Sequence, residues 1–166
     1  MPPPIAAAAR HGIAYRDERD DDLPFLRALY LSTRAEEVAQ TGWPIAAQHA
    51  FLNQQFDFQR AHYRAHYPAE WLVIERAGEA LGRLYLERAA GDFRVIDISL
   101  IPAARGTGIG GAILSDVIAE AGAAAAKVSI HVEHVNPARR LYDRLGFVAV
   151  AEEGPYIRME RPAQVS

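Results

Sequence analysis

The chain has 166 residues, a length typical of one domain. Half of the residues are hydrophobic and 23% are charged, as in ordinary globular proteins. Eighteen basic and 21 acidic residues give a net charge of −3, which argues against nucleic acid or an anionic membrane as partner. The absence of cysteine excludes disulfides, thiolate catalysis, zinc fingers and iron–sulfur clusters.

The first twelve residues are rich in proline and alanine, and we expect them to form a disordered tail before one domain at 13–163. Their short apolar run lacks the preceding positive charge of a signal peptide. No apolar run approaches the 18 residues that span a bilayer. These features predict a cytoplasmic protein.

Hydrophobic periodicity predicts helices and strands that alternate along the chain. Two helices come first, an antiparallel meander follows, and βα units close the domain. The pattern predicts an α/β fold with a mixed, mostly antiparallel sheet and helices on both faces. The expected elements are strands at 13–16, 71–75, 81–87, 93–101, 127–132, 147–151 and 156–160, and helices from 22, at 45–63, at 109–122 and at 136–146.

A glycine-rich stretch, residues 105–111, stands between a predicted buried strand and a predicted helix. Backbone amides at such a helix start favour a phosphate, and glycines let the backbone come close to it. A flexible turn without a ligand is the simpler interpretation. The position after a strand and before an amphipathic helix favours a ligand.

The stretch also satisfies the dinucleotide fingerprint GxGxxG, with Glu133 as a candidate ribose-binding acid, which would indicate an NAD-dependent oxidoreductase. Three observations argue against this reading. Residues 102–105 separate the strand from the glycines, no second nucleotide-binding half is present, and little chain remains for a catalytic domain. A kinase-type P-loop is excluded because no Gly-Lys-Ser/Thr follows.

Two motifs together resemble the GNAT superfamily of N-acyltransferases. Arg105-x-x-Gly108-x-Gly110, after a strand that stops at Pro102, resembles its acyl-CoA pyrophosphate loop. The segment from Asn136 to Phe147, NPARRLYDRLGF, resembles its second signature. The order of elements from about 13 to 160 also fits, so the resemblance covers most of the chain.

The resemblance implies transfer of an acyl group, usually acetyl, from acyl-CoA to a primary amine by direct transfer in a ternary complex, with no metal. Tyr142 would protonate the departing thiolate, since a phenol with a pKa near 10 stays protonated at neutral pH. A place in the apolar stripe of its helix would equally explain Tyr142. Asn136 is either an N-cap or a contact to the pantetheine arm.

Backbone amides are the other expected contacts to acyl-CoA. In the resembled family the pantetheine arm pairs with the strand before the loop, so amides near Ile98 and Leu100 would face the thioester oxygen. The residues expected around the pyrophosphate are Arg105, Gly106, Thr107, Gly108, Ile109 and Gly110.

The general base is the least defined part of the site. Asp97 stands in an otherwise apolar strand, where burial would raise the pKa of a carboxyl toward a useful range. An ion pair with Arg83 or Arg94 would equally explain Asp97. Weaker candidates are Glu75, Glu87 and His134, and a base acting through an ordered water would also work.

The acceptor is an amine of unknown identity, either a small molecule or a peptide or protein. Trp43, beside Glu36 and Glu37, is a candidate for binding a cationic amine. His62 and His66 have metal-ligand spacing but no third ligand, so we expect a packing role. A homodimer is possible, and a non-catalytic acyl-CoA sensor is the alternative function.

Overall fold

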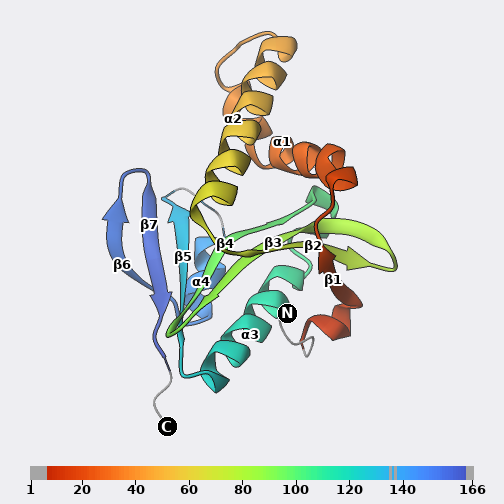
Figure 1. Ribbon diagram of the computed structural model, residues 1–166. Coiled ribbons are helices and arrows are strands. Elements are labelled where there is room, and N and C mark those ends of the chain that lie inside the picture. Colours follow the sequence, from red (N-terminus) through yellow and green to blue (C-terminus); the bar gives the residue numbers. More distant parts are fainter. Residues whose placement is uncertain (1–6, 135, 137, 164–166) are drawn as a thin grey trace.

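The computed structural model describes residues 7–134, 136 and 138–163, in which helices cover a twisted sheet (Figure 1). Short 3-10 helices lie at Ala8–His11, Asp20–Asp22 and Pro102–Ala104. The other elements are β1 (Ile13–Asp17), α1 (Leu23–Ala39), α2 (Ile45–His66), β2 (Glu70–Arg76), β3 (Glu79–Ala89), β4 (Asp92–Leu100), α3 (Ile109–Ala123), β5 (Lys127–Glu133), α4 (Arg139–Arg144), β6 (Val148–Glu153) and β7 (Tyr156–Arg161).

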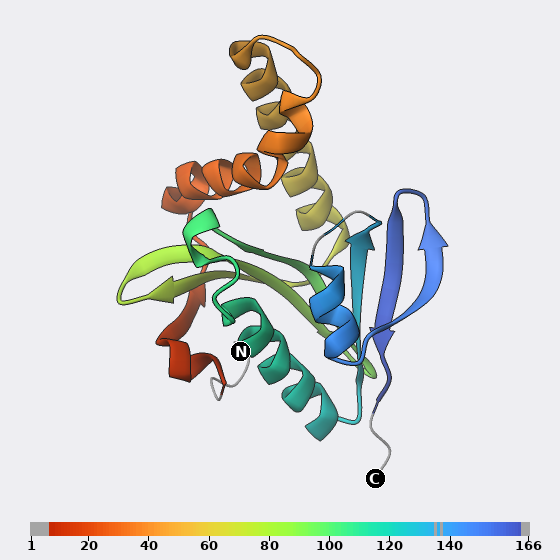
Figure 2. The same cartoon turned by 180° about the vertical axis from the view of Figure 1, so that it is seen from behind.

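The strands form one seven-stranded sheet in the order β1-β2-β3-β4-β5-β7-β6. Neighbouring strands are antiparallel except β4 and β5, which are parallel because the chain crosses over through α3. Figure 1 and Figure 2 show α1 and α2 on one face and α3 and α4 on the other. The predicted mixed, mostly antiparallel sheet with helices on both faces is confirmed.

The parallel pair β4 and β5 is joined over only part of its length. The ladder pairs Asp92–Val95 with Lys127–Ile130, yet β4 continues to Leu100 and β5 to Glu133. Beyond these pairs the two strands separate. We call this opening between the unpaired ends of β4 and β5 the splay.

A β-bulge marks where the splay begins. Tyr85 of β3 pairs with Asp97, and the next residue, Leu86, pairs with Val95. Ile96 is therefore an extra residue on β4. A bulge bends its strand and increases its local twist, which turns the second half of β4 away from β5.

Strand alternation gives the sheet one apolar face and one polar face. Leu84 and Leu86 of β3 point into the main core beneath α3, together with Ile113 and Val117 of that helix. Arg83 and Tyr85 alternate with these leucines along β3. Their side chains point to the opposite face of the sheet, under α1 and α2. The predicted apolar stripe of the 109–122 helix is confirmed.

The second helix packs over only half of its length. Leu52 and Phe56 are buried in a small core with Leu26 and Tyr30 of α1, whereas Ile45, predicted on the buried side, is 70% exposed. Figure 1 shows the start of α2 projecting away from the sheet. Helical periodicity predicts the helix correctly, but it does not show where the packed part begins.

The predicted tail needs correction at its C-terminal end. Residues 8–11 form a 3-10 helix with Ala8 fully buried. The backbone amides of Ala7 and Ala8 donate to the carboxylate of Asp116 in α3 at 2.8 and 3.0 Å. These contacts anchor the segment to α3, a long-range interaction that local composition does not indicate. Residues 1–6 of the predicted tail lie outside the described residues.

The other predicted boundaries agree with the structure to within a few residues. The largest differences are three residues: the helix predicted to end at Tyr63 ends at His66, and the helix predicted to start at Asn136 begins at Arg139. Pro137, expected at its first position, lies outside the described residues.

Candidate functional site

The glycine-rich stretch leads from β4 into α3 as a tight loop. Gly106 and Gly108 have φ angles of 71° and 88°, a left-handed conformation that favours glycine. The hydroxyl of Thr107 donates to the carbonyl of Ala104 at 2.5 Å and closes the turn. The first intrahelical bond runs from the amide of Ala112 to the carbonyl of Gly108.

The backbone amides of residues 106–110 have no acceptor among the residues that the structure describes. Three of them belong to the loop and two to the first turn of α3, where the helix leaves amides unpaired and carries a partial positive charge. A methyl group added at Gly106 would meet nothing within 4 Å. The loop therefore offers clustered donors to an anion that approaches closely.

Arg105 differs from the expected role in two ways. Its amide is already bonded to the carbonyl of Pro102 at 3.2 Å. Its guanidinium donates to the carbonyl of Leu100 and to the hydroxyl of Ser32 in α1, both at 2.9 Å. The side chain thus connects the loop to β4 and α1. The prediction that the amide of Arg105 binds the anion is wrong, because this amide already has an acceptor.

The free edge of β4 presents the two amides expected from the sequence. The amide of Ile101 donates to Leu81 of β3 at 2.8 Å. Since amides alternate between the two edges of a strand, those of Ile98 and Leu100 point away from β3, toward the splay. The bond from Arg105 to the carbonyl of Leu100 on this same edge agrees with that orientation.

Tyr142 lies on α4 at the apolar side of the splay. It is 5% exposed, and its ring meets Phe147 edge-on at 5.9 Å between centroids. Burial raises the pKa of Tyr142 to about 12, and the nearby negative charge of Asp97 adds to this effect. The core interpretation of Tyr142 therefore agrees with the structure, and its role as donor to the thiolate stays a prediction.

Asp97 lies on the polar face of β4 and is held by neighbours. One carboxylate oxygen forms an ion pair with the buried guanidinium of Arg83, and the other accepts from the hydroxyl of Ser99 at 3.0 Å. Arg83 also donates to Gln59 of α2 at 2.8 Å. The ion-pair interpretation of Asp97 is therefore present in the structure, with Arg83 and not Arg94 as the partner.

Asn136 ends the turn that follows β5. Its side-chain oxygen accepts from the amide of Ala138 at 2.8 Å, and its carbonyl accepts from Arg139 at 3.1 Å. This is an Asx turn ahead of α4, whose N-cap is Ala138, so the N-cap prediction for Asn136 is wrong and the contact to the pantetheine arm stays a prediction.

Trp43 does not lie beside the other predicted residues. It is 45% exposed and packs edge-on against Phe51 at 5.5 Å, at the projecting end of α2. Tyr63, near the other end of this helix, is separated from Trp43 by about 30 Å at 1.5 Å per residue. The structure thus separates Trp43 from the splay, and its assignment to acceptor binding stays a prediction that this position does not favour.

The weaker acid–base candidates have structural partners or lie at the surface. Glu75 accepts from Arg16 at 2.9 Å, and Glu87 lies 4.0 Å from Arg94. His134 is exposed after β5. Glu133, the candidate ribose ligand, forms an ion pair with Arg34 of α1, which occupies the carboxylate that a dinucleotide would need.

His62 and His66 stack at 4.3 Å on the surface of α2, as expected for a packing role. Within the described ranges, no three side chains of the types that hold metals come together. No helix of the described chain is long and apolar enough to cross a membrane.

Two tyrosines near the splay were missed by the sequence analysis. Tyr85 lies on the polar face beside Arg83, and Tyr63 of α2 meets Tyr85 edge-on at 6.3 Å. Burial raises the pKa of Tyr63 and Tyr85, with Asp97 contributing in both. The alternation of polar and apolar residues at 83–87 was the signal that could have identified them. Large polar side chains repeat along one face of this strand, while its other face lies in the hydrophobic core.

Comparisons with known proteins agree with this geometry. The family model for an acetyltransferase (GNAT) domain matches residues 68–149, which include the glycine loop, the splay and α4. No curated protein sequence matches the chain.

Three solved structures illustrate the similarity of fold. A PaiA N-acetyltransferase from Thermoplasma acidophilum, solved in complex with coenzyme A, has a TM-score of 0.67 at 14% identity, over 90% of this chain and 98% of that one. An HPA2-related acetyltransferase from Corynebacterium glutamicum gives 0.64 at 21%, over 93% and 98%. The ribosomal-protein-S18-alanine N-acetyltransferase from Escherichia coli gives 0.57 at 15%, over 93% and 96%. At these identities the likeness establishes the fold.

Proposed function

Because the chain belongs to the GNAT superfamily, we propose that it transfers an acetyl group from acetyl-CoA directly to a primary amine. One observation carries the proposal. The splay is bordered by the unpaired amides of residues 106–110, the free edge of β4, Tyr142 and Asp97. The amides can bind a diphosphate, the strand edge can bind a thiol arm, and the two side chains can exchange protons at the end of that arm.

Acetyl-CoA fits the residues present. The amides of 106–110 would bind its pyrophosphate, and the absence of a side chain at Gly106 leaves room for close approach. The outward amides of Ile98 and Leu100 would pair with the amide groups of the pantetheine arm, as an added strand does. The cosubstrate supplies an activated acetyl thioester, and the chain's own residues position it.

The two faces of the sheet keep donor and acceptor apart until they meet at the splay. The glycine loop and α4 belong to the apolar side, whereas Asp97 and Ser99 lie on the polar face under α1 and α2. An amine that enters along the polar face reaches the splay from the side opposite the pantetheine arm. This arrangement supports direct transfer, and the chain has no cysteine to serve as a thiolate carrier.

Asp97 is our proposed acceptor of the amine proton. Each carboxylate oxygen has a second lone pair besides the one used by Arg83 or Ser99, so a further donor can bind. The ion pair with Arg83 fixes the orientation of the carboxylate. An amine with a pKa near 10 is almost fully charged at neutral pH, so removal of its proton is required before attack.

Tyr142 is our proposed donor to the departing sulfur. With a pKa of about 12 its hydroxyl keeps its proton throughout the neutral range. Full transfer to a free thiolate, whose acid has a pKa near 8.5, is unfavourable by about three orders of magnitude. The phenol therefore acts best by hydrogen bonding to the sulfur as charge develops, with the proton released from the amine completing the thiol.

The proposal is tested by measuring release of free coenzyme A from acetyl-CoA across a panel of amines. The protein adds no background to thiol detection because it has no cysteine. Apart from its N-terminus, Lys127 is its one amine, so release without added acceptor is expected to be small. Acceptor-dependent release supports the enzyme. Binding of coenzyme A without release from any amine would instead support the acyl-CoA sensor.

A further inference from the structure

A narrow pocket with almost no free volume lies on the polar face, next to the proposed transfer site. Its floor comes from β2 and β3 and its wall from the end of α2. It extends from Asp97 and its pair partner Tyr85 toward Trp71, away from the splay. The lining residues are Arg60, Tyr63, Arg64, Trp71, Arg83 and Tyr85.

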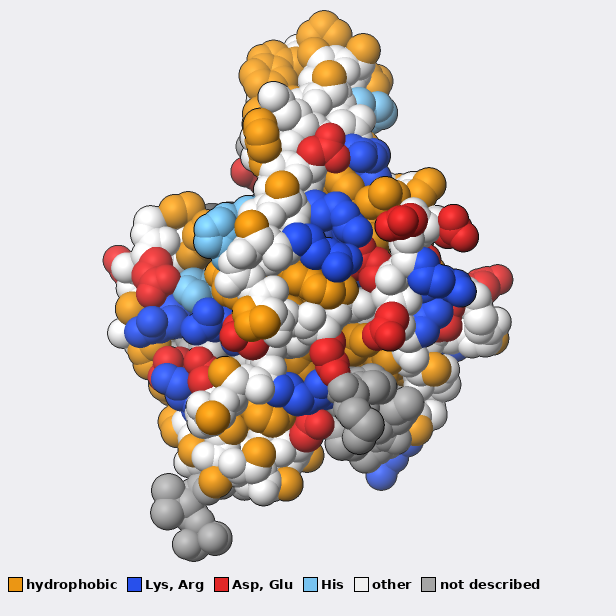
Figure 3. All heavy atoms as spheres, viewed as in Figure 1, with side chains coloured by type: hydrophobic (Ala, Val, Ile, Leu, Met, Phe, Trp, Pro, Cys, Tyr) orange, Lys and Arg blue, Asp and Glu red, His pale blue; other side chains and the backbone are white. Residues whose placement is uncertain are grey.

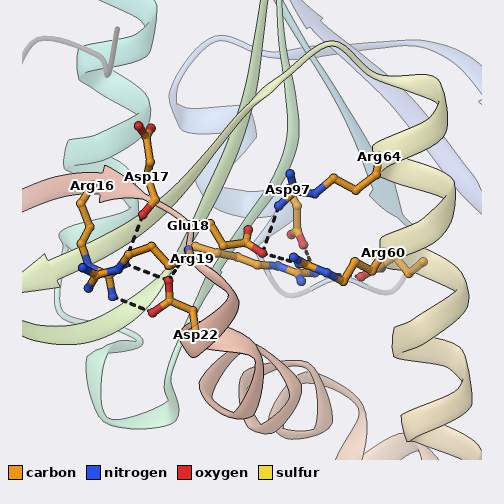
Figure 4. Close-up of polar contacts among 10 residues, drawn as sticks. Arg16, Asp17, Glu18, Arg19, Asp22, Arg60, Arg64 and Asp97 are labelled. Carbon is orange, nitrogen blue, oxygen red and sulfur yellow. Dashed lines mark hydrogen bonds and ion pairs between the residues drawn. The ribbon is translucent and has the colours of Figure 1, made fainter.

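Positive charge exceeds negative charge at the mouth of this pocket. Arg60 and Arg64 both reach from α2 to one oxygen of Glu18, whose side chain is 1% exposed (Figure 4). Figure 3 shows basic side chains grouped beside α2 on this face. Two guanidiniums with five N–H donors each share this carboxylate, so several charged donors remain for a ligand. Arg64 is 41% exposed, which leaves it accessible.

Buried polar atoms lie around the same pocket. Within the described chain, Nε of Arg83 has no hydrogen-bond partner, whereas the hydroxyl of Tyr85 lies within hydrogen-bonding reach of the Glu18 carboxylate. A buried polar group without a partner is costly and rare in native proteins. An unpartnered guanidinium donor beside this opening indicates a site that a polar ligand can complete.

The rest of the pocket is aromatic. Trp71 meets Tyr85 edge-on at 4.7 Å, and the guanidinium of Arg64 lies 4.4 Å above the ring of Trp71. Tyr63 closes the side toward the splay. The rings offer apolar contact to the carbon atoms of a small molecule, and the stacking holds Arg64 in place.

We propose that the acceptor amine carries a second, anionic group, as a free amino acid does. Its carboxylate would bind Arg60 and Arg64, its carbon atoms would contact the aromatic rings, and its amine would point toward Asp97. A carboxylate matches the fork of donors that a guanidinium presents. The inference rests on the proposed acetyl transfer and adds the substrate class to it.

Binding can be tested without turnover, because the chain has two tryptophans and one of them lines the pocket. In a W43F protein saturated with coenzyme A, the fluorescence of Trp71 alone is followed. The probes are the standard amino acids and their matching amino-acid amides, which keep the amine but lose the negative charge. We expect at least one amino acid to bind about tenfold or more tightly than its amide.

The variant Arg64→Ala in the same background should remove this preference. Arg27→Ala is the matched control, because Arg27 also stacks on an aromatic ring, Phe56 at 4.8 Å, and pairs with an acid, Asp57, but lies outside the pocket. The control should keep the preference. Equal binding of acids and amides, no saturable signal from any probe, or an unchanged preference in R64A would overturn the inference.

The acetylation assay with the same paired probes separates this inference from the proposed function. Equal acetylation of amino acids and amides would leave the acetyltransferase intact and overturn the anionic acceptor. Discrimination in binding with no coenzyme A release would support the anion site and contradict acetyl transfer.

Discussion

At the scale of single residues, the hydroxyl of Tyr142 is the proposed donor to the departing sulfur. Replacing Tyr142 with Phe removes this hydroxyl but keeps the ring against Phe147. We expect kcat to fall about a hundredfold or more, with coenzyme A affinity largely unchanged. Steady-state kinetics and calorimetric titration with coenzyme A measure the two effects.

The control for this change is Tyr15→Phe, which removes another buried phenol whose hydroxyl has no hydrogen-bond partner among the described residues. It should leave kcat near that of the unchanged protein. A Y142F protein that turns over as fast as Y15F would show that Tyr142 is only a core residue.

Asp97 has both a structural and a proposed chemical role, and pH separates them. Asp97→Asn leaves the buried Arg83 without its counter-ion, which should lower the free energy of unfolding by about 3 kcal/mol. If Asp97 accepts the amine proton, the loss in kcat/KM should be largest near pH 7. It should shrink as the pH approaches 10, because the acceptor itself then loses its proton.

The matched control is Asp92→Asn, on the same strand, where the carboxylate accepts from Ser129 at 2.8 Å and lies away from the splay. It should preserve kcat/KM at every pH. A loss in D97N that stays constant between pH 7 and 10 would assign Asp97 a structural role alone.

The role of a residue could be predicted from sequence where a motif fixes the local backbone conformation. It could not be predicted where the role depends on distant elements. The loop glycines are local features, so spacing was enough. The partners of Asp97 and the position of Trp43 depend on how α2 crosses the sheet. That crossing is a tertiary property, which also explains why Tyr63 was missed.

At the scale of elements, the glycine loop can be tested apart from its effect on stability. Gly106 and Gly42 have almost equal φ angles, 71° and 73°, and neither has a neighbour within 4 Å of an added methyl group. Each change to Ala should therefore cost about 1 kcal/mol of stability through backbone strain. Only Gly106→Ala should also weaken coenzyme A binding, by about tenfold or more, because the methyl occupies the anion's approach.

Chemical denaturation and calorimetric titration of both variants check this prediction. The stability losses test the shared backbone effect, and the difference in affinity tests the site. Equal coenzyme A affinities in G106A and G42A would contradict a pyrophosphate at the loop.

Most strands could be predicted because turns containing Gly78 and Gly91 and the stop at Pro102 delimit them. The splay could not be predicted, because the bulge at Ile96 changes pairing without changing the apolar pattern of the strand. The 3-10 helix at 8–11 was missed for a similar reason: its stability comes from Asp116, more than a hundred residues away.

At the scale of the whole molecule, buried phenols predict a loss of stability in alkali. Burial is the main cause of raised pKa values in Tyr15, Tyr30, Tyr63, Tyr85 and Tyr142. A group whose pKa is higher in the folded than in the unfolded state contributes fully to stability at pH values below its unfolded-state pKa. That contribution is lost as the pH rises from about 10 through the folded pKa.

Each such phenol can lower the free energy of unfolding by up to about 1.4 kcal/mol per pH unit above pH 10. The remaining basic side chains add little to this dependence, since all but Lys127 are arginine or histidine. Urea denaturation at a series of pH values should show steady stability from pH 8 to 9.5 and a steep decline beyond. Unchanged stability up to pH 11 would contradict the burial of these hydroxyls.

The sheet separates an apolar face, which carries the loop and Tyr142, from a polar face, which carries Asp97 and the arginine pocket. In the proposed function, this division lets acetyl-CoA and the amine approach the splay from opposite faces of the sheet. The account depends above all on the amides of residues 106–110, which lack partners in the described chain.

Hydrogen exchange of these amides, with and without coenzyme A, tests that claim most directly. Unpartnered amides exchange fast, and a bound pyrophosphate should slow residues 106–110 together with Ile98 and Leu100 on the edge of β4. Protection confined to these two segments and their neighbours is the predicted result. Exchange at 106–110 that is equally fast with saturating coenzyme A would contradict the account.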